Sequence, residues 1–175
     1  KKHVGHGIPS TLFAISRLKS NMPSHQIWSS IITAPLTVGF GGSVGLEGPT
    51  VATGAAIGSN FGRLLHLNQA TRTLLIGAAA AGAMSSIFKA PIAAIVFAVE
   101  IFSLALTLAS MTPLILASIT AVLTSYFFFG DDVLFHFQLQ DRFELPDLFF
   151  LLFLGLTTAV ISIHFSKVYH YIAQA

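Results

Sequence analysis

The sequence contains no cysteine, which excludes disulfide frameworks and thiolate metal sites. Charge is also scarce: charged residues make up 9% of the chain and hydrophobic residues 54%, whereas soluble domains carry about 25% charged residues. The formal net charge of +2 is too small to indicate a nucleic-acid partner. No signal peptide is visible, because Lys1 and Lys2 lead into a Gly/Pro element, and we interpret the chain as a fragment. These shortages are typical of a membrane protein.

The few charges are unevenly distributed along the chain. Lys89 is the only one between Thr73 and Val99, and the stretches 101–130 and 148–166 contain none. A hydrocarbon core about 30 Å thick is crossed by roughly 20 apolar residues in a helix. The two uncharged stretches therefore predict membrane-spanning helices, and the chain is expected to be an all-α, multi-pass integral membrane protein.

Proline precedes most of the apolar segments, and proline suits the first turn of a helix. The sequence predicts helices that start near Ile8, Gly48, Pro91, Pro113 and Pro146, with two more over Ser24–Val38 and Ala70–Ile87. Gly48–Leu65 and Pro91–Glu100 are too short to cross a bilayer upright. Tilted and broken helices of this kind favour a permeation site, because helix ends inside a membrane must face protein or a water-filled cavity. The alternative is that these segments are tilted or interfacial.

Small residues recur every four positions in two of these segments. Gly54, Gly58 and Gly62 form one series, and the pairs Gly77–Ala81 and Ala78–Gly82 form two more. Each series lines one face of a helix and lets a neighbouring helix approach closely. This pattern predicts tight helix packing, not chemistry.

The stretch between Gly130 and Asp147 is the one clear loop, and its charges are acidic except for Arg142. The acidic residues are Asp131, Asp132, Asp141, Glu144 and Asp147. A loop poor in Lys and Arg is favoured on the non-cytoplasmic face.

The most informative segment runs from Gly41 to Thr50 and holds a single carboxylate, that of Glu47, among glycines directly before a helix start. An ionisable residue at membrane depth is costly and is read first as functional. A helix N-terminus offers free N–H groups and about half a positive charge, so it can bind an anion without Lys or Arg. Glu47 can then compete with that anion as a tethered carboxylate.

Two other interpretations of this segment stay open. Glu47 can merely cap its helix, since acidic residues are favoured there. A phosphate-binding loop is a weaker alternative, because the segment has no lysine at the required place.

A second Gly/Pro element, Val4–Pro9, has the same design. Within it, His6 can donate a hydrogen bond to an anion or bond a backbone carbonyl.

Taken in order, these motifs resemble the CLC family of chloride channels and chloride/proton exchangers. The segment from Gly45 to Pro49 is similar to the family's G-[KR]-E-G-P signature, and Gly5–Pro9 is similar to G-S-G-I-P. Three later segments resemble the G-A-A-A-G, F-x-A-P and F-x-x-E elements: Ala78–Gly82, Phe88–Pro91 and Phe97–Glu100. The first of these has Ala78 where the family often has glycine. The similarity covers nearly the whole chain.

The resemblance implies the front half of an antiparallel two-repeat fold that assembles as a homodimer. Residues 1–130 would belong to the first repeat, 131–145 to an inter-repeat loop on the outer face, and 146–175 to the first helix of the second repeat. Glu47 would be the gating glutamate, while His6, Gly7, Gly45 and Gly48 would surround the anion path. The helices starting at Pro91 and Pro113 would contact the partner subunit, and no cofactor or metal is implied.

Three departures from the family pattern concern the mechanism. His6 replaces the usual serine, and Leu46 replaces the basic residue beside the gate. Glu100 aligns with the first of two positions that are acidic in many exchangers, and Ile101 occupies the second, the internal proton-transfer position. Losing that carboxylate favours passive conduction. Glu100 is a possible substitute on the proton path, but pairing with Lys89 or capping backbone is its favoured role.

We therefore expect a glutamate-gated chloride channel in a prokaryotic plasma membrane, with a proton-coupled anion exchanger as the nearest alternative. A non-conducting scaffold subunit is the alternative from another class, and the small-residue faces would suit it. An enzyme is not expected, since the sequence has no paired His/Glu metal motif and no convincing Ser/His pair. The chain lacks the family's G-x-F-x-P signature and late tyrosine, so we expect no conduction from this fragment alone.

Overall fold

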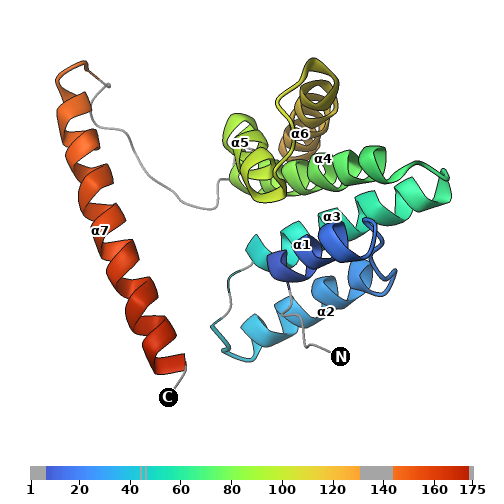
Figure 1. The fold of residues 1–175 in the computed structure, drawn as a ribbon, viewed down its shortest axis with the longest axis horizontal. Helices are drawn as coiled ribbons and strands as arrows, with labels where there is room; N and C mark the ends of the chain where they lie inside the picture. Colours follow the sequence, from blue (N-terminus) through green and yellow to red (C-terminus); the bar gives the residue numbers. More distant parts are fainter. Residues whose placement is uncertain (1–6, 44, 46, 131–143, 174–175) are drawn as a thin grey trace. The chain divides into compact units, whose positions relative to one another are not determined.

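The computed structural model describes residues 7–43, 45, 47–130 and 144–173, and these residues form helices joined by turns (Figure 1). The helices are α1 (Ile8–Arg17), α2 (Gln26–Gly39), α3 (Glu47–Leu64), α4 (Gln69–Phe88), α5 (Pro91–Phe102), α6 (Leu108–Phe129) and α7 (Asp147–Ala173). The predicted all-α class is confirmed. The chain divides into two compact units, Lys1–His136 and Phe137–Ala175. The assignment of 1–130 and 146–175 to two repeats stays a prediction.

Three of the described helices, α4, α6 and α7, are long and apolar enough to cross a membrane. The stretches predicted to span, 101–130 and 148–166, contain α6 and most of α7, so that prediction is confirmed. Helix α5 is apolar but shorter, as expected of a helix that begins at Pro91. Helix α7 is the most apolar of the three, with a mean hydropathy of 2.2 in its best window.

One predicted helix start is wrong. Helix α6 begins at Leu108, and Pro113 lies inside it rather than at its first turn. The reason is a reciprocal cap: the Thr107 side chain accepts from the Ser110 N–H, and the Ser110 hydroxyl accepts from the Thr107 N–H. This cap satisfies the first free N–H groups five residues before the proline. Pro113 then removes a single hydrogen bond from the helix, the one that an N–H at this position would donate to the Ala109 carbonyl.

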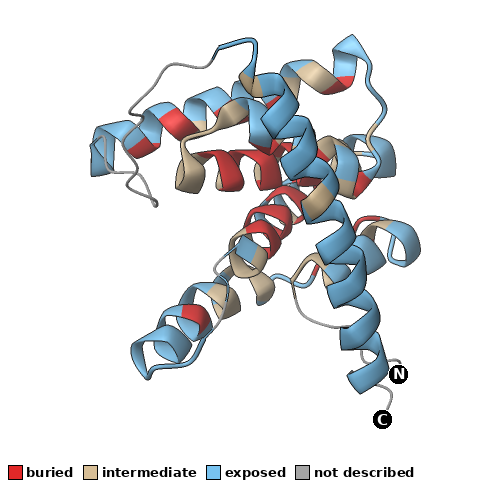
Figure 2. Cartoon of the chain, turned by 90° about the vertical axis from the view of Figure 1, so that its left-hand side faces the viewer, coloured by how far each residue is buried: buried red, intermediate tan, exposed pale blue. Residues whose placement is uncertain are grey.

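The core of the first unit is built from small residues on α3 and α4, and Figure 2 shows buried residues concentrated on the central helices. A Cβ added to Gly54 would lie 2.7 Å from the Ala79 carbonyl oxygen, and one added to Gly58 would lie 2.4 Å from that of Leu75. Gly82 faces α6, where its Cβ would lie 3.2 Å from the Ala117 oxygen. The predicted close packing on these glycine faces is confirmed.

Serine hydroxyls connect the helices within this core. Ser85 Oγ donates to the Ser118 carbonyl, and Ser125 Oγ donates to the Ser86 carbonyl, both at 2.9 Å, so α4 and α6 are joined twice. Ser59 of α3 donates to the Ser20 carbonyl at 2.7 Å and accepts from the Met22 N–H at 2.9 Å. Ser59 therefore fixes the turn between α1 and α2 against α3.

Replacing Ser59 with alanine should lower the free energy of unfolding by about 1–3 kcal/mol, because two buried backbone groups lose their partner. Thermal unfolding in detergent, followed by far-UV circular dichroism, measures the change. Ser16→Ala is the matched control, since Ser16 is exposed and bonds only within its own helix. Equal stability of the two variants would contradict the assigned role of Ser59.

Candidate anion site

Glu47 is the first residue of α3, and Pro49 lies in the same turn. Proline lacks an N–H and so suits a helix start, where donors have no intrahelical acceptor. A carboxylate at this end of the helix is favoured by the helix dipole. Glu47 is exposed, and its side chain folds back over Gly45: a Cβ at Gly45 would lie 2.7 Å from Glu47 Oε2. Glycine at position 45 thus makes room for the carboxylate.

The start of α1 depends on a second glycine. Gly7 precedes the helix with φ 80° and ψ −138°, a backbone conformation that is accessible essentially to glycine alone. Its carbonyl oxygen accepts from Ser10 Oγ at 2.7 Å and from the Thr11 N–H at 3.3 Å. Gly7 has no side chain to cap the first turn of α1, so the positive end of this helix is formed by its backbone N–H groups.

These two helix starts meet. A Cβ placed on Gly7 would lie 3.7 Å from the carbonyl oxygen of Gly48 and 3.8 Å from its Cα, although the two residues are far apart in sequence. Gly7, Gly45, Glu47 and Gly48 are therefore brought to one place by the ends of α1 and α3. His6, also predicted for this site, lies outside the described residues. The arrangement joins two helix N-termini and one carboxylate, which suits an exchangeable anion site.

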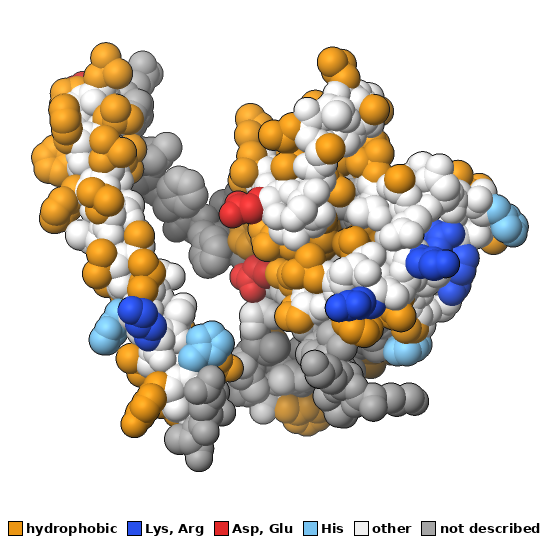
Figure 3. All heavy atoms as spheres, in the orientation of Figure 1, with side chains coloured by type: hydrophobic (Ala, Val, Ile, Leu, Met, Phe, Trp, Pro, Cys, Tyr) orange, Lys and Arg blue, Asp and Glu red, His pale blue; other side chains and the backbone are white. Residues whose placement is uncertain are grey.

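Glu100 lies elsewhere, in the last turn of α5, where it is exposed and its carbonyl accepts from the Ser103 N–H. The predicted pairing of Glu100 with Lys89 is wrong. The two residues stand at opposite ends of α5, about 16 Å apart along the helix axis. Lys89 Nζ instead donates to the Gly130 carbonyl and lies 4.6 Å from the centre of the Tyr126 ring. Figure 3 shows the acidic side chains of this face as isolated groups among hydrophobic and uncharged atoms.

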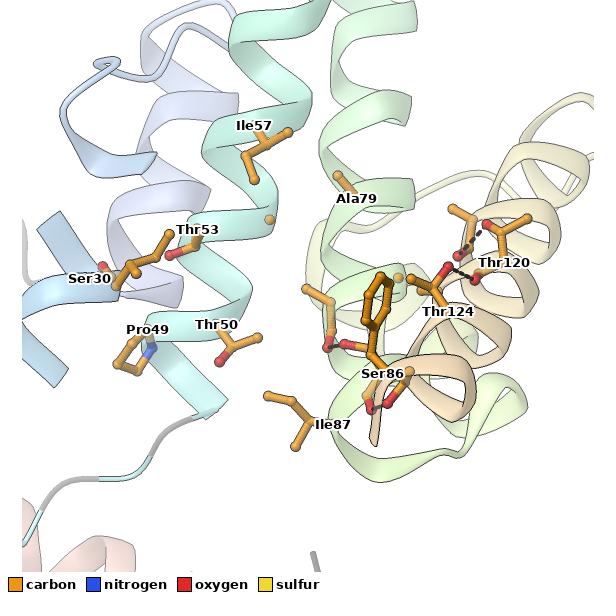
Figure 4. A pocket seen from close by; sticks show the side chains of 18 of the residues that line it. Ser30, Pro49, Thr50, Thr53, Ile57, Ala79, Ser86, Ile87, Thr120 and Thr124 are labelled. Atoms are coloured by element: carbon orange, nitrogen blue, oxygen red, sulfur yellow. Dashed lines mark hydrogen bonds between the residues drawn. The ribbon is translucent and has the colours of Figure 1, made fainter. Parts of the chain in front are cut away.

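A cavity of about 1090 Å³ adjoins the start of α3, and the sequence did not reveal it. Pro49, Thr50 and Thr53 line it from α3, and it is completed by residues of α2, α4 and α6 (Figure 4). A possible signal is the i, i+4 spacing of Thr120 and Thr124 on α6.

Three hydroxyls that line this cavity donate within their own helices, and that of Ser125 donates to the Ser86 carbonyl of α4. Thr120 donates to the Leu116 carbonyl at 2.7 Å, Thr124 to that of Thr120 at 2.8 Å, and Ser86 to that of Ala83 at 2.8 Å. These three hydroxyls have no further proton to donate to an anion, and most other lining residues are apolar. The candidate anion site is therefore at the joined helix starts rather than in the cavity.

Comparison with known proteins agrees with these features. The family model described as voltage gated chloride channel matches residues 1–175. The chain is 32% identical over 163 residues to a putative chloride channel protein ClcB-like of Ralstonia nicotianae, covering 89% of this chain and 34% of the relative. It is 32% identical over 132 residues to an H(+)/Cl(-) exchange transporter ClcA of Vibrio cholerae, covering 74% of this chain and 28% of that protein.

A plant protein is also similar. The chain is 31% identical over 144 residues to chloride channel protein CLC-f of Arabidopsis thaliana, covering 78% of this chain and 18% of that protein. The chain thus spans about a third or less of the length of these curated relatives. No solved structure gave a significant match.

Proposed function

Because the chain belongs to the voltage-gated chloride channel family, which matches it over residues 1–175, we propose that it forms part of a transmembrane chloride pathway gated by Glu47. The observation that carries the proposal is the meeting of two helix N-termini: a Cβ on Gly7 would lie 3.7 Å from Gly48, and Glu47 opens α3 beside it. Such a site binds an anion through backbone dipoles alone.

The same geometry explains how the anion would be released. A fixed Lys or Arg binds chloride tightly, whereas helix dipoles bind it weakly enough for it to leave again. The Glu47 carboxylate competes for the same positive helix end, since it is tethered there and negatively charged. Protonation, or rotation of the side chain away from Gly45, vacates the site for chloride.

Two residues outside the described part of the chain tune this proposed site. A neutral imidazole at His6 donates one hydrogen bond to the anion, and a protonated one adds charge and therefore pH dependence. Leu46 contributes no positive charge beside the gate, where a basic residue would attract anions. Both features predict a pathway whose chloride attraction relies on backbone more than on side-chain charge.

The channel is our leading candidate because Ile101, which follows Glu100 in the last turn of α5, has no proton to carry. The second candidate is a proton-coupled exchanger, and the similarity to a Vibrio cholerae protein named as an H(+)/Cl(-) exchange transporter favours it. The exposed carboxylate of Glu100 would then be the proton carrier. Both candidates are transporters rather than enzymes.

The proposal extends to assembly and location. Helix α6 exposes large apolar side chains, including Leu116 and Leu123, which are 59% and 61% exposed. The surface around them would be covered by lipid or by a second copy in a homodimer. Relatives from bacteria support a prokaryotic plasma membrane as the location.

The test uses the natural protein that contains this chain, reconstituted in liposomes under a chloride gradient with chloride and proton fluxes recorded together. We expect chloride flux without proton movement against its gradient. Proton movement uphill at a fixed ratio to chloride would instead establish the exchanger and show that Ile101 has been bypassed. Absence of chloride flux would refute both candidates and favour a scaffold role.

A further inference from the structure

Basic residues meet at one end of the first unit, where the connection between α1 and α2 lies against the connection between α3 and α4. Arg72 donates to Asn21 Oδ1 at 2.5 Å and to the Leu67 carbonyl at 2.9 Å. Arg63 donates to Ser24 Oγ at 2.8 Å. Lys19 is held in the same place, because its carbonyl accepts from Arg72 at 3.5 Å.

Arg17 stands two residues before Lys19, in the last turn of α1. We call Arg17, Lys19, Arg63 and Arg72 the basic end. The aliphatic part of the Arg72 side chain packs against Gly62, which precedes Arg63: a Cβ on Gly62 would lie 3.0 Å from Arg72 Cγ. The four cations thus come from three helices and from the turn between α1 and α2.

The charges of the basic end have no carboxylate partner on the helices that build it. The hydrogen-bond acceptors of Arg63 and Arg72 are neutral amide, hydroxyl and carbonyl oxygens. Residues 1–46 and 48–99 contain no Asp or Glu, and Glu47 stands at the far end of α3, about 24 Å from Arg63 along the axis. In Figure 3 the Lys and Arg side chains of this unit lie toward the right and the acidic ones toward its left.

Exposed large apolar side chains occur near these cations along the chain. Arg17, Lys19 and Arg63 are exposed, and the adjacent Leu64 is 71% exposed. Trp28, in the first turn of α2 close to Ser24, is 66% exposed. Tryptophan together with Lys and Arg at a helix end is the composition of a membrane–water interface.

Helix α4 leads away from the basic end. Arg72 lies near its first residue, and Lys89, directly after its last residue, donates to the Gly130 carbonyl. The distance from Arg72 to Lys89 along the axis is about 25 Å, close to the thickness of a bilayer core. Because Lys and Arg are enriched in short cytoplasmic loops, the four cations at this end of α4 favour the cytoplasmic face for the basic end.

We infer that the basic end binds the phosphate groups of anionic phospholipids in the cytoplasmic leaflet. Guanidinium groups match phosphate oxygens with two parallel hydrogen bonds, and the exposed Arg63 is oriented by bonds from Nη2 to Ser24 and Asn60. Arg72, whose Nη1 and Nη2 donate to neighbouring neutral oxygens, adds positive charge behind it. The N-terminus of α4, which Asn68 caps through the Thr71 N–H, adds positive potential at the same surface. Trp28 and Leu64 rest in the interface beneath the headgroups.

The test measures, by native mass spectrometry, the lipid retained on the detergent-solubilised natural protein that contains this chain, with phosphatidylglycerol and phosphatidylcholine added in equal amounts. The wild-type chain should prefer phosphatidylglycerol, and Arg63→Gln should lower that preference about fivefold, the effect of one cation near an anionic surface. Arg63→Lys should retain the preference within about twofold. Because Arg63 also bonds Ser24, Arg17→Gln provides a second variant at an exposed position and should show a similar loss.

Lys89→Gln is the charge-matched control, since Lys89 lies at the other end of α4 and should leave the preference unchanged. An equal loss in Lys89→Gln would overturn the proposal, because the preference would then reflect net charge rather than this surface. An unchanged preference in Arg17→Gln and Arg63→Gln would also overturn it. Displacement of the lipid by inorganic phosphate at equal concentration would point to a soluble anion instead of a lipid.

Discussion

Replacing Glu47 with alanine is expected to raise chloride flux about 10- to 100-fold at neutral pH, in the natural protein reconstituted in liposomes. The carboxylate lies at the start of α3 beside Gly45, where it competes with chloride for the joined ends of α1 and α3. If it occupies that site in about 90–99% of molecules, as in a two-state equilibrium of a few kcal/mol, removing it frees the site in all of them. Chloride efflux measured with an electrode gives the ratio.

Removing only the charge should have a similar effect. Glu47→Gln keeps the length of the side chain but has no negative charge to compete with chloride, so it should also raise chloride flux. Glu144→Gln is the control, because it removes an exposed carboxylate outside the first unit. Unchanged flux in Glu47→Ala and Glu47→Gln would argue against a gate and leave helix capping as the role of Glu47.

Much of the helical order was predictable, because the signals are local. Proline at a first turn correctly placed the starts of α1 and α5, and the glycine series at Gly54 and Gly58 correctly predicted a packed face. The start of α6 was predicted wrongly for an equally local reason: the Thr107–Ser110 cap, which the proline pattern does not reveal, begins the helix five residues before Pro113. A capping box satisfies free N–H groups, whereas an internal proline only removes one.

The site was predictable only in part, because its geometry joins distant segments. The residue types around Glu47 indicated an anion site, yet nothing local places Gly7 within 3.7 Å of Gly48. The cavity beside Pro49 needs three further helices, and so it has no signature of its own. The predicted pairing of Glu100 with Lys89 was wrong because almost the whole length of α5 separates the two residues, and their opposite charges alone do not reveal this.

Replacing Gly58 with alanine should be the most damaging single-methyl change in the core of the first unit. The added Cβ would lie 2.4 Å from the Leu75 carbonyl oxygen, 2.9 Å from its carbon and 3.0 Å from Ala79 Cβ. A backbone oxygen in α4 cannot rotate aside as a side chain does, so α3 and α4 must move apart. Overpacking of this kind costs about 1–3 kcal/mol, and thermal unfolding of the detergent-solubilised chain measures it.

Gly155→Ala is the matched control, because nothing lies within 4 Å of the Cβ position at Gly155 in α7. There the substitution should stabilise the helix by up to about 1 kcal/mol, since alanine is the better helix former. The two variants differ only in what the methyl group meets, so opposite signs would identify the α3–α4 contact as the cause. Because α3 also carries Glu47 at its start, the helix separation in Gly58→Ala should lower chloride flux as well when the natural protein that contains this chain is reconstituted in liposomes. Equal stability of Gly58→Ala and the wild type would mean that α3 and α4 do not pack at this distance.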